Sequence, residues 1–274
     1  MPLLNERSEP LEWTEPDDVP RAIVTYGMKS EMIVDFELQP HRHLKGQILL
    51  VQRGALACEI EGGLWIVPPR SAIWIPGGAL HSIKVTGALE GYGAFISDQV
   101  DSRLPAACRT IAATPLLREL LVRAAGLPLL YEEAGANARL LAVLLDELVM
   151  APVEGLHLPM PADARLRQVT GEMIAAPAER GTVASWAARA GMSERTLLRS
   201  IRRETGMSFG RWRQQLGIVL AVQWMAGGTT IQQAATDLGY ESVPAFMTMF
   251  KKALGISPGR YMAERHATKN QGGS

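Results

Sequence analysis

The last hundred or so residues of the chain contain an internal repeat, and this repeat restricts the fold more than any other feature of the sequence. From Ser193 onward the two copies are offset by 49 residues, and the second copy has one extra residue in its glycine turn. A period near 50 residues is typical of two copies of one supersecondary unit. The matched positions are Ala187, Gly191, Ser193, Leu197, Ile201, Gly206, Ser208 and Trp212 in the first copy, and Ala235, Gly239, Ser242, Phe246, Phe250, Gly255, Ser257 and Tyr261 in the second.

Each copy predicts a short helix, a glycine turn and a second helix. In the first copy, Gly191 ends one helix in a left-handed conformation and Ser193 caps the next. Gly239 and Ser242 take the same places in the second copy. A glycine turn followed by a helix with a basic outer face is the helix-turn-helix arrangement that places a helix in the major groove of DNA. The predicted helices are 183–190, 194–205, 231–238, 243–254 and one that begins at Ser257-Pro258.

The stretch between the two copies, 208–225, predicts one continuous helix of 18 residues. At 1.5 Å per residue such a helix is roughly 27 Å long. Successive major-groove faces on one side of B-DNA lie ~34 Å apart. A stiff connector of this length can place the second helix of each unit, 194–205 and 243–254, on one face of a duplex.

The net charge of zero conceals an asymmetry between the two parts of the chain. Residues 1–162 contain 13 Lys and Arg against 20 Asp and Glu, a net charge of −7, whereas residues 163–274 contain 15 against 8, a net charge of +7. This favours double-stranded DNA as a partner of the C-terminal part over an incidental difference in charge. Cys58 and Cys108 form no CxxC pair, which fits a reducing cytoplasm. We expect neither a signal peptide nor a membrane partner.

Residues 165–265 resemble the DNA-binding domain of the AraC/XylS family of bacterial transcription regulators. The resemblance is strongest in GYESVPAFMTMFKKALGISPGRYM, residues 239–262, whose glycine, aromatic and Ser-Pro positions match the hallmark segment of the family. It implies an all-α domain with two helix-turn-helix units that controls transcription at specific promoters. If the protein is an activator, RNA polymerase is a further partner.

The resemblance also indicates which residues contact DNA. Arginine can bind O6 and N7 of guanine with two donors, so Arg195 and Arg199 suit base edges, whereas basic residues further along each helix suit phosphates. In the second unit only Thr248 can hydrogen-bond a base, so this unit is expected to anchor more than it discriminates. The alternative is a solvated basic face without base contacts. The candidates are Arg195, Thr196, Leu198, Arg199, Arg202 and Arg203 in the first unit, and Val243, Pro244, Met247, Thr248, Lys251 and Lys252 in the second.

The N-terminal half predicts a different architecture. Residues 22–97 contain short apolar runs separated by turns, a pattern typical of an all-β barrel or sandwich. Two leucine-rich amphipathic helices follow, and two interpretations of them stay open: packing against the barrel, or a dimer interface. The leucines are Leu116, Leu117, Leu120 and Leu121 in the first helix, and Leu140, Leu141, Leu144, Leu145 and Leu148 in the second.

Three of the five histidines lie in two short motifs of this strand-rich half. It resembles the cupin-like sensory domain common in the AraC/XylS family, and metal-binding cupins carry H-x-H followed by a glutamate, then P-x-G-x-x-H. His41, His43 and His81 fit these motifs, but Gln47 stands at the glutamate position and Val85 at that of a later asparagine. Alternate residues of a strand point the same way, so the resemblance implies that the three imidazoles face one cavity.

The chemistry of this cluster leaves three possibilities. Three imidazoles suit a divalent transition metal such as Zn, Ni or Fe, with Gln47 as a weak fourth ligand. Alternatively, the histidines hydrogen-bond an organic effector in a metal-free pocket, or they are purely structural. Trp65 and Trp74 are candidates for the cavity lining or for the core, and His157 is expected to be solvated.

Together these patterns predict an α+β protein of two domains: an N-terminal cupin-like β-barrel followed by helices, and a C-terminal all-α domain with two helix-turn-helix units. The predicted segments are an acidic arm at 1–20, an effector-binding and dimerisation domain at 21–155, a linker at 156–163, a DNA-binding domain at 164–266 and a disordered tail at 267–274.

The leading functional hypothesis is a cytoplasmic, homodimeric transcription regulator controlled by a small-molecule or metal effector, and not an enzyme. A metal-dependent cupin enzyme is the alternative, and an architectural DNA binder with a vestigial barrel is a third possibility. The missing glutamate and the complete DNA-binding unit count against the enzyme. The sequence also lacks GxSxG, a P-loop and a dinucleotide-binding GxGxxG.

Overall fold

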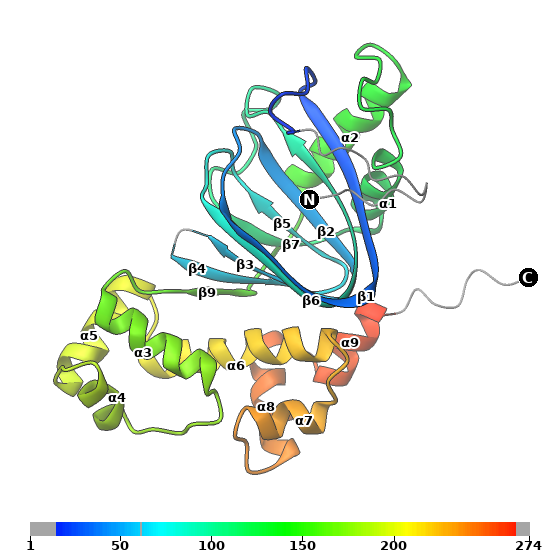
Figure 1. Cartoon of the computed structure of the whole chain (residues 1–274). Coiled ribbons are helices and arrows are strands. Elements are labelled where there is room, and N and C mark those ends of the chain that lie inside the picture. The colour runs from blue at the N-terminus through cyan, green and yellow to red at the C-terminus, as the bar shows by residue number, and fades with distance from the viewer. Residues whose placement is uncertain (1–14, 61, 267–274) are drawn as a thin grey trace, which may run out of the picture. The chain divides into compact units, whose positions relative to one another are not determined.

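The computed structural model (Figure 1) describes residues 15–60 and 62–266, which form two compact units. Of the described residues, the first unit comprises 15–60 and 66–155, and the second comprises 62–65 and 156–266. An antiparallel sheet with two helices forms the first unit, and helices form most of the second, so the predicted fold class is confirmed. The disordered tail predicted at 267–274 and residues 1–14 of the predicted acidic arm lie outside the described residues.

The sheet of the first unit is organised around two long strands. Its strands are β1 (Ile23–His41), β2 (Gly46–Arg53), β3 (Leu56–Ile60), β5 (Ser71–Ile75), β6 (His81–Ile96), β7 (Arg109–Ala112) and β8 (Val153–Glu154). β6 pairs with β1 along one side, and on its other side with β3 in its first part and β2 in its last part. From β2 the sheet continues through β5 and β7 to β8. The long pair of β1 and β6 therefore runs alongside both β3 and β2. The sheet curves around an interior (Figure 1).

Strand β2 shows why this sheet has two buried faces. Every residue from Gly46 to Val51 is buried. Alternate residues of a strand point to opposite faces: Ile48 and Leu50 belong to a core covered by helices, whereas Gln47 and Leu49 line an interior cavity. A strand buried on both faces appears in the sequence as a continuous apolar run rather than an alternating one.

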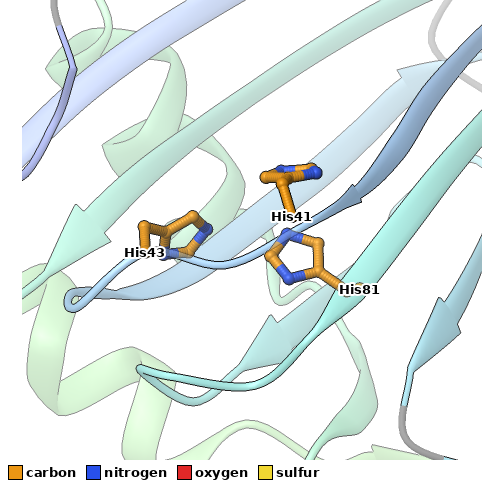
Figure 2. Close-up of side chains that lie close together, drawn as sticks. All are labelled: His41, His43 and His81. Atoms are coloured by element: carbon orange, nitrogen blue, oxygen red, sulfur yellow. The ribbon is translucent and has the colours of Figure 1, made fainter.

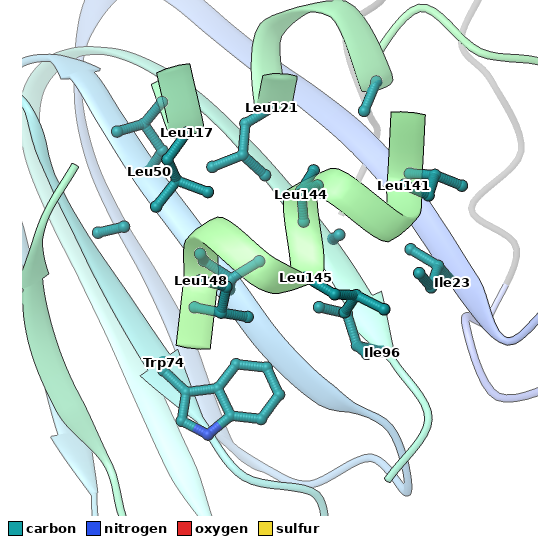
Figure 3. Close-up of a cluster of buried hydrophobic side chains, with 14 of the residues drawn as sticks. Ile23, Leu50, Trp74, Ile96, Leu117, Leu121, Leu141, Leu144, Leu145 and Leu148 are labelled. Carbon is teal, nitrogen blue, oxygen red and sulfur yellow. The ribbon is translucent and has the colours of Figure 1, made fainter. Parts of the chain in front are cut away.

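Two helices cover the outer face of the sheet, namely α1 (Pro115–Ala124) and α2 (Ala136–Met150). Thr114 caps α1, where its hydroxyl accepts a hydrogen bond from the backbone N–H of Leu117 at 3.0 Å. Figure 3 shows the leucines of both helices packed on Ile23, Leu50, Trp74 and Ile96 of the sheet. Packing is therefore the role of Leu117, Leu121, Leu141, Leu144, Leu145 and Leu148, whereas Leu116 is 50% exposed.

The end of the predicted acidic arm is hydrogen-bonded to the loop that precedes β2. Asp17 accepts hydrogen bonds from the backbone N–H groups of Leu44 and Lys45 at 2.6 and 3.0 Å. The buried Lys45 ammonium donates to the carbonyls of Pro16 and Val19. Burial lowers the pKa of Lys45, and Asp17 partly offsets this effect. Residues 16–19 of the predicted acidic arm are therefore fixed by hydrogen bonds to the loop before β2.

The helices of the second unit begin and end as their caps dictate. Gly191 and Gly239 adopt φ angles of +61° and +69° in the two turns, which only glycine adopts readily. Ser193 and Ser242 cap the helices that follow, by accepting hydrogen bonds from backbone N–H groups three residues ahead at 3.2 and 3.4 Å. The helices are α3 (Ala164–Ala175), α4 (Val183–Arg189), α5 (Glu194–Thr205), α6 (Phe209–Ala226), α7 (Ile231–Asp237), α8 (Val243–Leu254) and α9 (Pro258–His266).

The segment 156–163, predicted as a plain linker, contains the strand β9 (His157–Pro159). β9 pairs with residues 63–65, the first part of β4 (Gly63–Val67), and both segments belong to the second unit. Helix α6 fixes β9, because the Trp212 indole N–H donates to the Pro159 carbonyl at 2.7 Å and the Gln215 amide donates to the His157 carbonyl at 3.0 Å. The linker prediction is therefore wrong for 157–159.

His157 is also not solvated as predicted. Its ring stacks on that of Trp65 with centroids 3.9 Å apart and planes 16° apart. Burial lowers the pKa of His157 to about 4.

Within the described residues, no helix is both long enough and apolar enough to span a membrane.

Candidate DNA interface and histidine cluster

Helix α5 of the first helix-turn-helix unit separates its apolar and basic residues on opposite sides. Leu197 and Ile201 are fully buried beneath it. Every predicted DNA-contacting residue of this helix is at least partly exposed, including Leu198 at 41%. Thr196 is the least exposed, and its hydroxyl lies 2.9 Å from that of the cap residue Ser193. The arginines Arg195, Arg199, Arg202 and Arg203 are exposed.

The arginines of α5 differ in their neighbours. Arg203 forms an ion pair with Glu204 at 2.8 Å, and Glu204 also accepts the backbone N–H groups of Ala162 and Asp163. The Asp163 N–H and the Arg203 guanidinium lower the pKa of Glu204. Among the described residues, no carboxylate pairs with Arg195 or Arg199, so their two-pronged donors are available to guanine.

Helix α8 of the second unit has the same buried side and a different exposed one. Phe246 and Phe250 take the places of Leu197 and Ile201 in its core. Met247 is 39% exposed, and the remaining predicted contacts are exposed except for the partly buried Val243; these are Pro244, Thr248, Lys251 and Lys252.

Thr248 is more restricted than the sequence indicated. Its hydroxyl donates a hydrogen bond to the backbone carbonyl of Pro244 at 2.9 Å. A hydroxyl has one donor and two acceptor lone pairs, so Thr248 can still accept a hydrogen bond. It therefore suits the amino group of adenine or cytosine rather than a base acceptor.

The three motif histidines of the first unit lie together, as predicted (Figure 2). His41 ends β1 and His81 begins β6, and the two residues are direct partners in the register of these strands. His43 follows in the loop before β2, and the N–H of Gly78 donates to its carbonyl at 2.8 Å. Ring centroids are 4.3 Å apart for His41 and His81, and 5.0 Å apart for His43 and His81. One ring nitrogen of each histidine lies within 4.8 Å of the other two.

The hydrogen bonds of these histidines determine their tautomers. Each Nδ1 faces a backbone carbonyl: that of Gln39 for His41 at 2.9 Å, that of Lys45 for His43, and that of Ala79 for His81 at 2.9 Å. A carbonyl oxygen can only accept, so Nδ1 carries the hydrogen in the neutral form of each ring, and the lone pair lies on Nε2. In His43 this lone pair faces another acceptor, the amide oxygen of Gln47 at 3.3 Å, and two acceptors that face each other suit a cation between them. This arrangement of a backbone carbonyl behind each ring is the usual one for histidines that bind a metal through Nε2.

His81 and Gln47 complete the chemistry of the cluster. His81 is 1% exposed, and its Nε2 makes no hydrogen bond among the described residues. Burial lowers the pKa of His81 to about 4, so the ring is neutral at pH 7. The amide oxygen of Gln47 lies 3.3 Å from Nε2 of His43, and its amide nitrogen donates to the Tyr26 hydroxyl at 2.6 Å. Adjacent tetrahedral ligands with bonds of about 2.0–2.1 Å lie about 3.3–3.4 Å apart, so Gln47 fits as a fourth ligand beside His43.

An interior cavity of about 170 Å³ is lined by His41, His43 and Gln47 of the cluster, whereas His81 is not among its lining residues. Its lining is mainly apolar, with residues from β1, β2 and β6 such as Met28, Leu49, Val85 and Phe95. Tyr26 also lines it, and the sequence did not single out this residue because it lies in no motif. Neither Trp65 nor Trp74 belongs to the lining: Trp65 stacks on His157, and Trp74 lies in the helix-covered core with its indole N–H on the Pro105 carbonyl.

Two helix-turn-helix units with exposed basic residues, arginines on α5 and lysines on α8, linked by one stiff helix, define a DNA-binding transcription regulator. A family model described as a helix-turn-helix domain matches residues 186–264. The HTH-type transcriptional regulator NimR of Escherichia coli (strain K12) is 44% identical over 223 residues, which cover 81% of each chain. RipA of Corynebacterium glutamicum, also an HTH-type transcriptional regulator, is 27% identical over 103 residues, 38% of this chain and 31% of that protein.

Among solved structures, ToxT from Vibrio cholerae O395 is 12% identical, with 90% of this chain and 99% of that chain covered and a TM-score of 0.39. Because that score is below 0.5, the family assignment rests on the sequence relatives. The chain belongs to the AraC family of transcription regulators, and it is a regulator rather than an enzyme.

Proposed function

We propose that this regulator controls transcription in response to a divalent transition metal bound by His41, His43 and His81. The observation that carries this proposal is the shared hydrogen bonding of the three clustered imidazoles. Each ring gives its Nδ1–H to a backbone carbonyl, which leaves Nε2 for a ligand. One ring nitrogen of each histidine lies within 4.8 Å of the other two, and Nε2 of His43 lies 3.3 Å from the amide oxygen of Gln47. Such a set suits Zn, Ni or Fe.

Metal binding would act on transcription through the equilibrium between forms of the protein that differ in DNA affinity. A ligand shifts such an equilibrium only as far as it binds one form better than the other. In the DNA-bound form, α5 and α8 occupy successive major grooves of a promoter, where Arg195 and Arg199 bind base edges and Lys251 and Lys252 bind phosphates.

The test measures metal content and operator affinity on the same preparations of the full-length protein. Operator sequences come from genomic mapping of binding sites with and without added metal. We expect Zn²⁺, Ni²⁺ or Fe²⁺ to bind one per chain and to change operator affinity, and His43→Ala to abolish both effects while the fold stays intact. His157→Gln is the matched control, because it removes a histidine outside the cluster. A metal response that survives in His43→Ala would contradict the proposal.

Gln47→Glu gives a second and opposite test. A carboxylate is a better ligand than an amide for these ions, so this substitution is expected to raise metal affinity by about tenfold or more. The readout is a competition titration against a chromophoric chelator. Unchanged affinity would remove Gln47 from the ligand set.

A second candidate effector is a small apolar organic molecule in the metal-free cavity. The apolar lining by Met28, Leu49 and Phe95 favours it, with the histidines then acting as hydrogen-bond acceptors through Nε2. In the test, the protein is first treated with a chelator. If added metal then leaves its operator affinity unchanged, and small apolar compounds change that affinity, the result supports this candidate over the metal.

We also propose that the regulator is a cytoplasmic homodimer. Exposed apolar side chains on α1 and α2 support a second copy as their partner, notably Leu116, Val143 and Met150, of which Met150 is 69% exposed. Light scattering of wild-type protein and of Leu116→Glu with Met150→Glu tests the dimer. If the protein activates transcription, RNA polymerase is a further partner.

A further inference from the structure

A cleft of about 340 Å³ lies between the two helix-turn-helix units, and none of the residues assigned above to DNA lines it. One wall is the loop between α3 and α4, which carries Arg180. Another is one side of α6, which carries Arg213. The turn between α7 and α8 closes it with Tyr240. This loop and turn touch directly, because a Cβ on Gly239 would lie 2.6 Å from the carbonyl oxygen of Ala178.

The two arginines of the cleft have aromatic and carbonyl neighbours. The guanidinium of Arg180 lies 4.6 Å from the ring centre of Tyr240, and that of Arg213 lies 5.7 Å from the ring centre of Trp186 and donates to the Glu179 carbonyl at 2.9 Å. In the part of the chain that the structure describes, no ion pair joins either guanidinium to a carboxylate. The carboxylate of Glu179 is bound by Arg189.

Two positive charges are therefore held in one cleft, and neither forms an ion pair with a carboxylate among the described residues. Burial lowers the pKa of the half-buried Arg213 and the charge of Arg180 lowers it further, whereas the charge of Glu179 partly offsets these effects. Removing a charge from water without pairing it is costly, and the cost falls when an anion binds beside it. An anion between Arg180 and Arg213 would be attracted by both guanidinium groups and would reduce their mutual repulsion.

The cleft also has room for an anion. Gly210 and Gly217 lie seven residues apart on α6, which places them on the same side of the helix, and both line the cleft. Gly217 is buried, yet a Cβ added there would meet no heavy atom within 4 Å. A glycine with open space beside it lets an anion approach the helix backbone closely.

We propose that this cleft binds a phosphate-type oxyanion between Arg180 and Arg213. The planar fork of arginine matches the oxygens of phosphate. Two sources supply such an oxyanion. One is a backbone phosphate of the duplex, since the backbone passes between successive major grooves where this cleft lies between the units, and this source rests on the proposed DNA binding. The other is a free phosphate or phosphate ester, which does not.

The first arm of the test uses full-length protein without DNA and inorganic phosphate at constant ionic strength. Tryptophan fluorescence is the readout, because Arg213 lies over the Trp186 ring. We expect saturable binding that Arg180→Gln and Arg213→Gln each weaken by about tenfold or more, since hydrogen bonds to charged groups are involved. Arg165→Gln is the control, because this exposed arginine of the same unit lies outside the cleft. Gly217→Leu keeps both charges, fills the cleft and should also prevent binding.

The second arm measures operator affinity against salt concentration. Each phosphate that a protein neutralises contributes about 0.9 to the slope of log affinity against log salt. A fall of about 0.9 in Arg180→Gln, but not in Arg165→Gln, identifies the duplex as the source; phosphate binding with an unchanged slope identifies a free anion. If both cleft variants match Arg165→Gln in both arms, the proposal is overturned. If wild-type protein binds no operator, the proposed DNA binding fails, and the phosphate arm alone decides the cleft.

Discussion

Helices α5 and α8 occupy equivalent places in the two repeats, and their buried apolar residues correspond. Leu197 and Ile201 in the first copy are replaced by Phe246 and Phe250 in the second, and all four are fully buried. Their exposed sides differ. α5 carries four arginines, whereas the corresponding side of α8 carries Pro244, Met247 and Thr248, with lysines only in its last turn.

This difference separates what a helix-turn-helix unit needs to fold from what it needs to read DNA. The core and the caps are shared because both units must fold in the same way. The exposed residues are free to diverge, since they make few contacts within the protein. We infer that the first unit supplies most of the base discrimination and the second unit mainly holds the protein on the duplex.

The largest effect is expected from the shared core. Phe250→Ala should lower the free energy of unfolding by about 3–5 kcal/mol, because it removes a fully buried aromatic ring and leaves a cavity. The equivalent Ile201→Ala should cost about 2–5 kcal/mol. Urea unfolding of the full chain measures both, with the exposed Leu198→Ala as a control. A smaller loss for Phe250→Ala than for Leu198→Ala would show that the second copy is not held by the same core.

The next effect separates the two exposed sides. Arg199→Ala should weaken binding to the operator by about 1–3 kcal/mol and relax the base preference at one position. Met247→Ala should cost less, because an exposed thioether makes only an apolar contact with a thymine methyl. Fluorescence anisotropy titrations with the operator and with single-base variants measure this. A greater loss of discrimination in Met247→Ala would reverse the assigned roles.

The caps are expected to matter about equally in the two copies. Ser193→Ala and Ser242→Ala should each lower the free energy of unfolding by about 1 kcal/mol, since each serine satisfies an N–H group in the first turn of its helix. Replacement by aspartate should restore most of the loss, because aspartate is also a good cap. Thermal unfolding monitored by circular dichroism provides the comparison, and no recovery with aspartate would point to a role other than capping.

The smallest effect concerns phosphate contacts. Lys251→Gln should reduce the slope of log affinity against log salt by about 0.9. Arg203→Gln should reduce it by less, because Glu204 already pairs with Arg203 at 2.8 Å in the free protein. Equal slopes for the two variants would mean that this ion pair opens completely on DNA. Arg165→Gln again serves as the control.

The helical unit was predictable because its signals are local. Ser193 and Ser242 stand directly before the helices they cap. Glycine at 191 and 239 by itself indicates the left-handed conformation found at both positions. The connector predicted at 208–225 is α6, with Ser208 as its cap. The histidine cluster could be predicted from the sequence for another reason: H-x-H and P-x-G-x-x-H are compact motifs that a known domain type carries.

The remainder depended on contacts between distant parts of the chain. Strand β1 is one strand of 19 residues, and its length is set by pairing with β6 rather than by its own composition. The pairing of β9 with residues 63–65 joins segments about ninety residues apart, and the prolines around 159 concealed it. The same pairing brings Trp65 to His157, which no pattern in the sequence indicated.

The four residues 62–65 leave the first unit in mid-chain, join the second unit and then return, so the backbone passes between the units three times instead of once. A fragment that starts at Leu156 would retain both helix-turn-helix units but would lose the strand that covers Leu158 and the ring that covers His157. Cutting or fusing the chain at this boundary therefore produces an incomplete fragment, and a functional graft of the helical unit has to bring its own replacement for that strand.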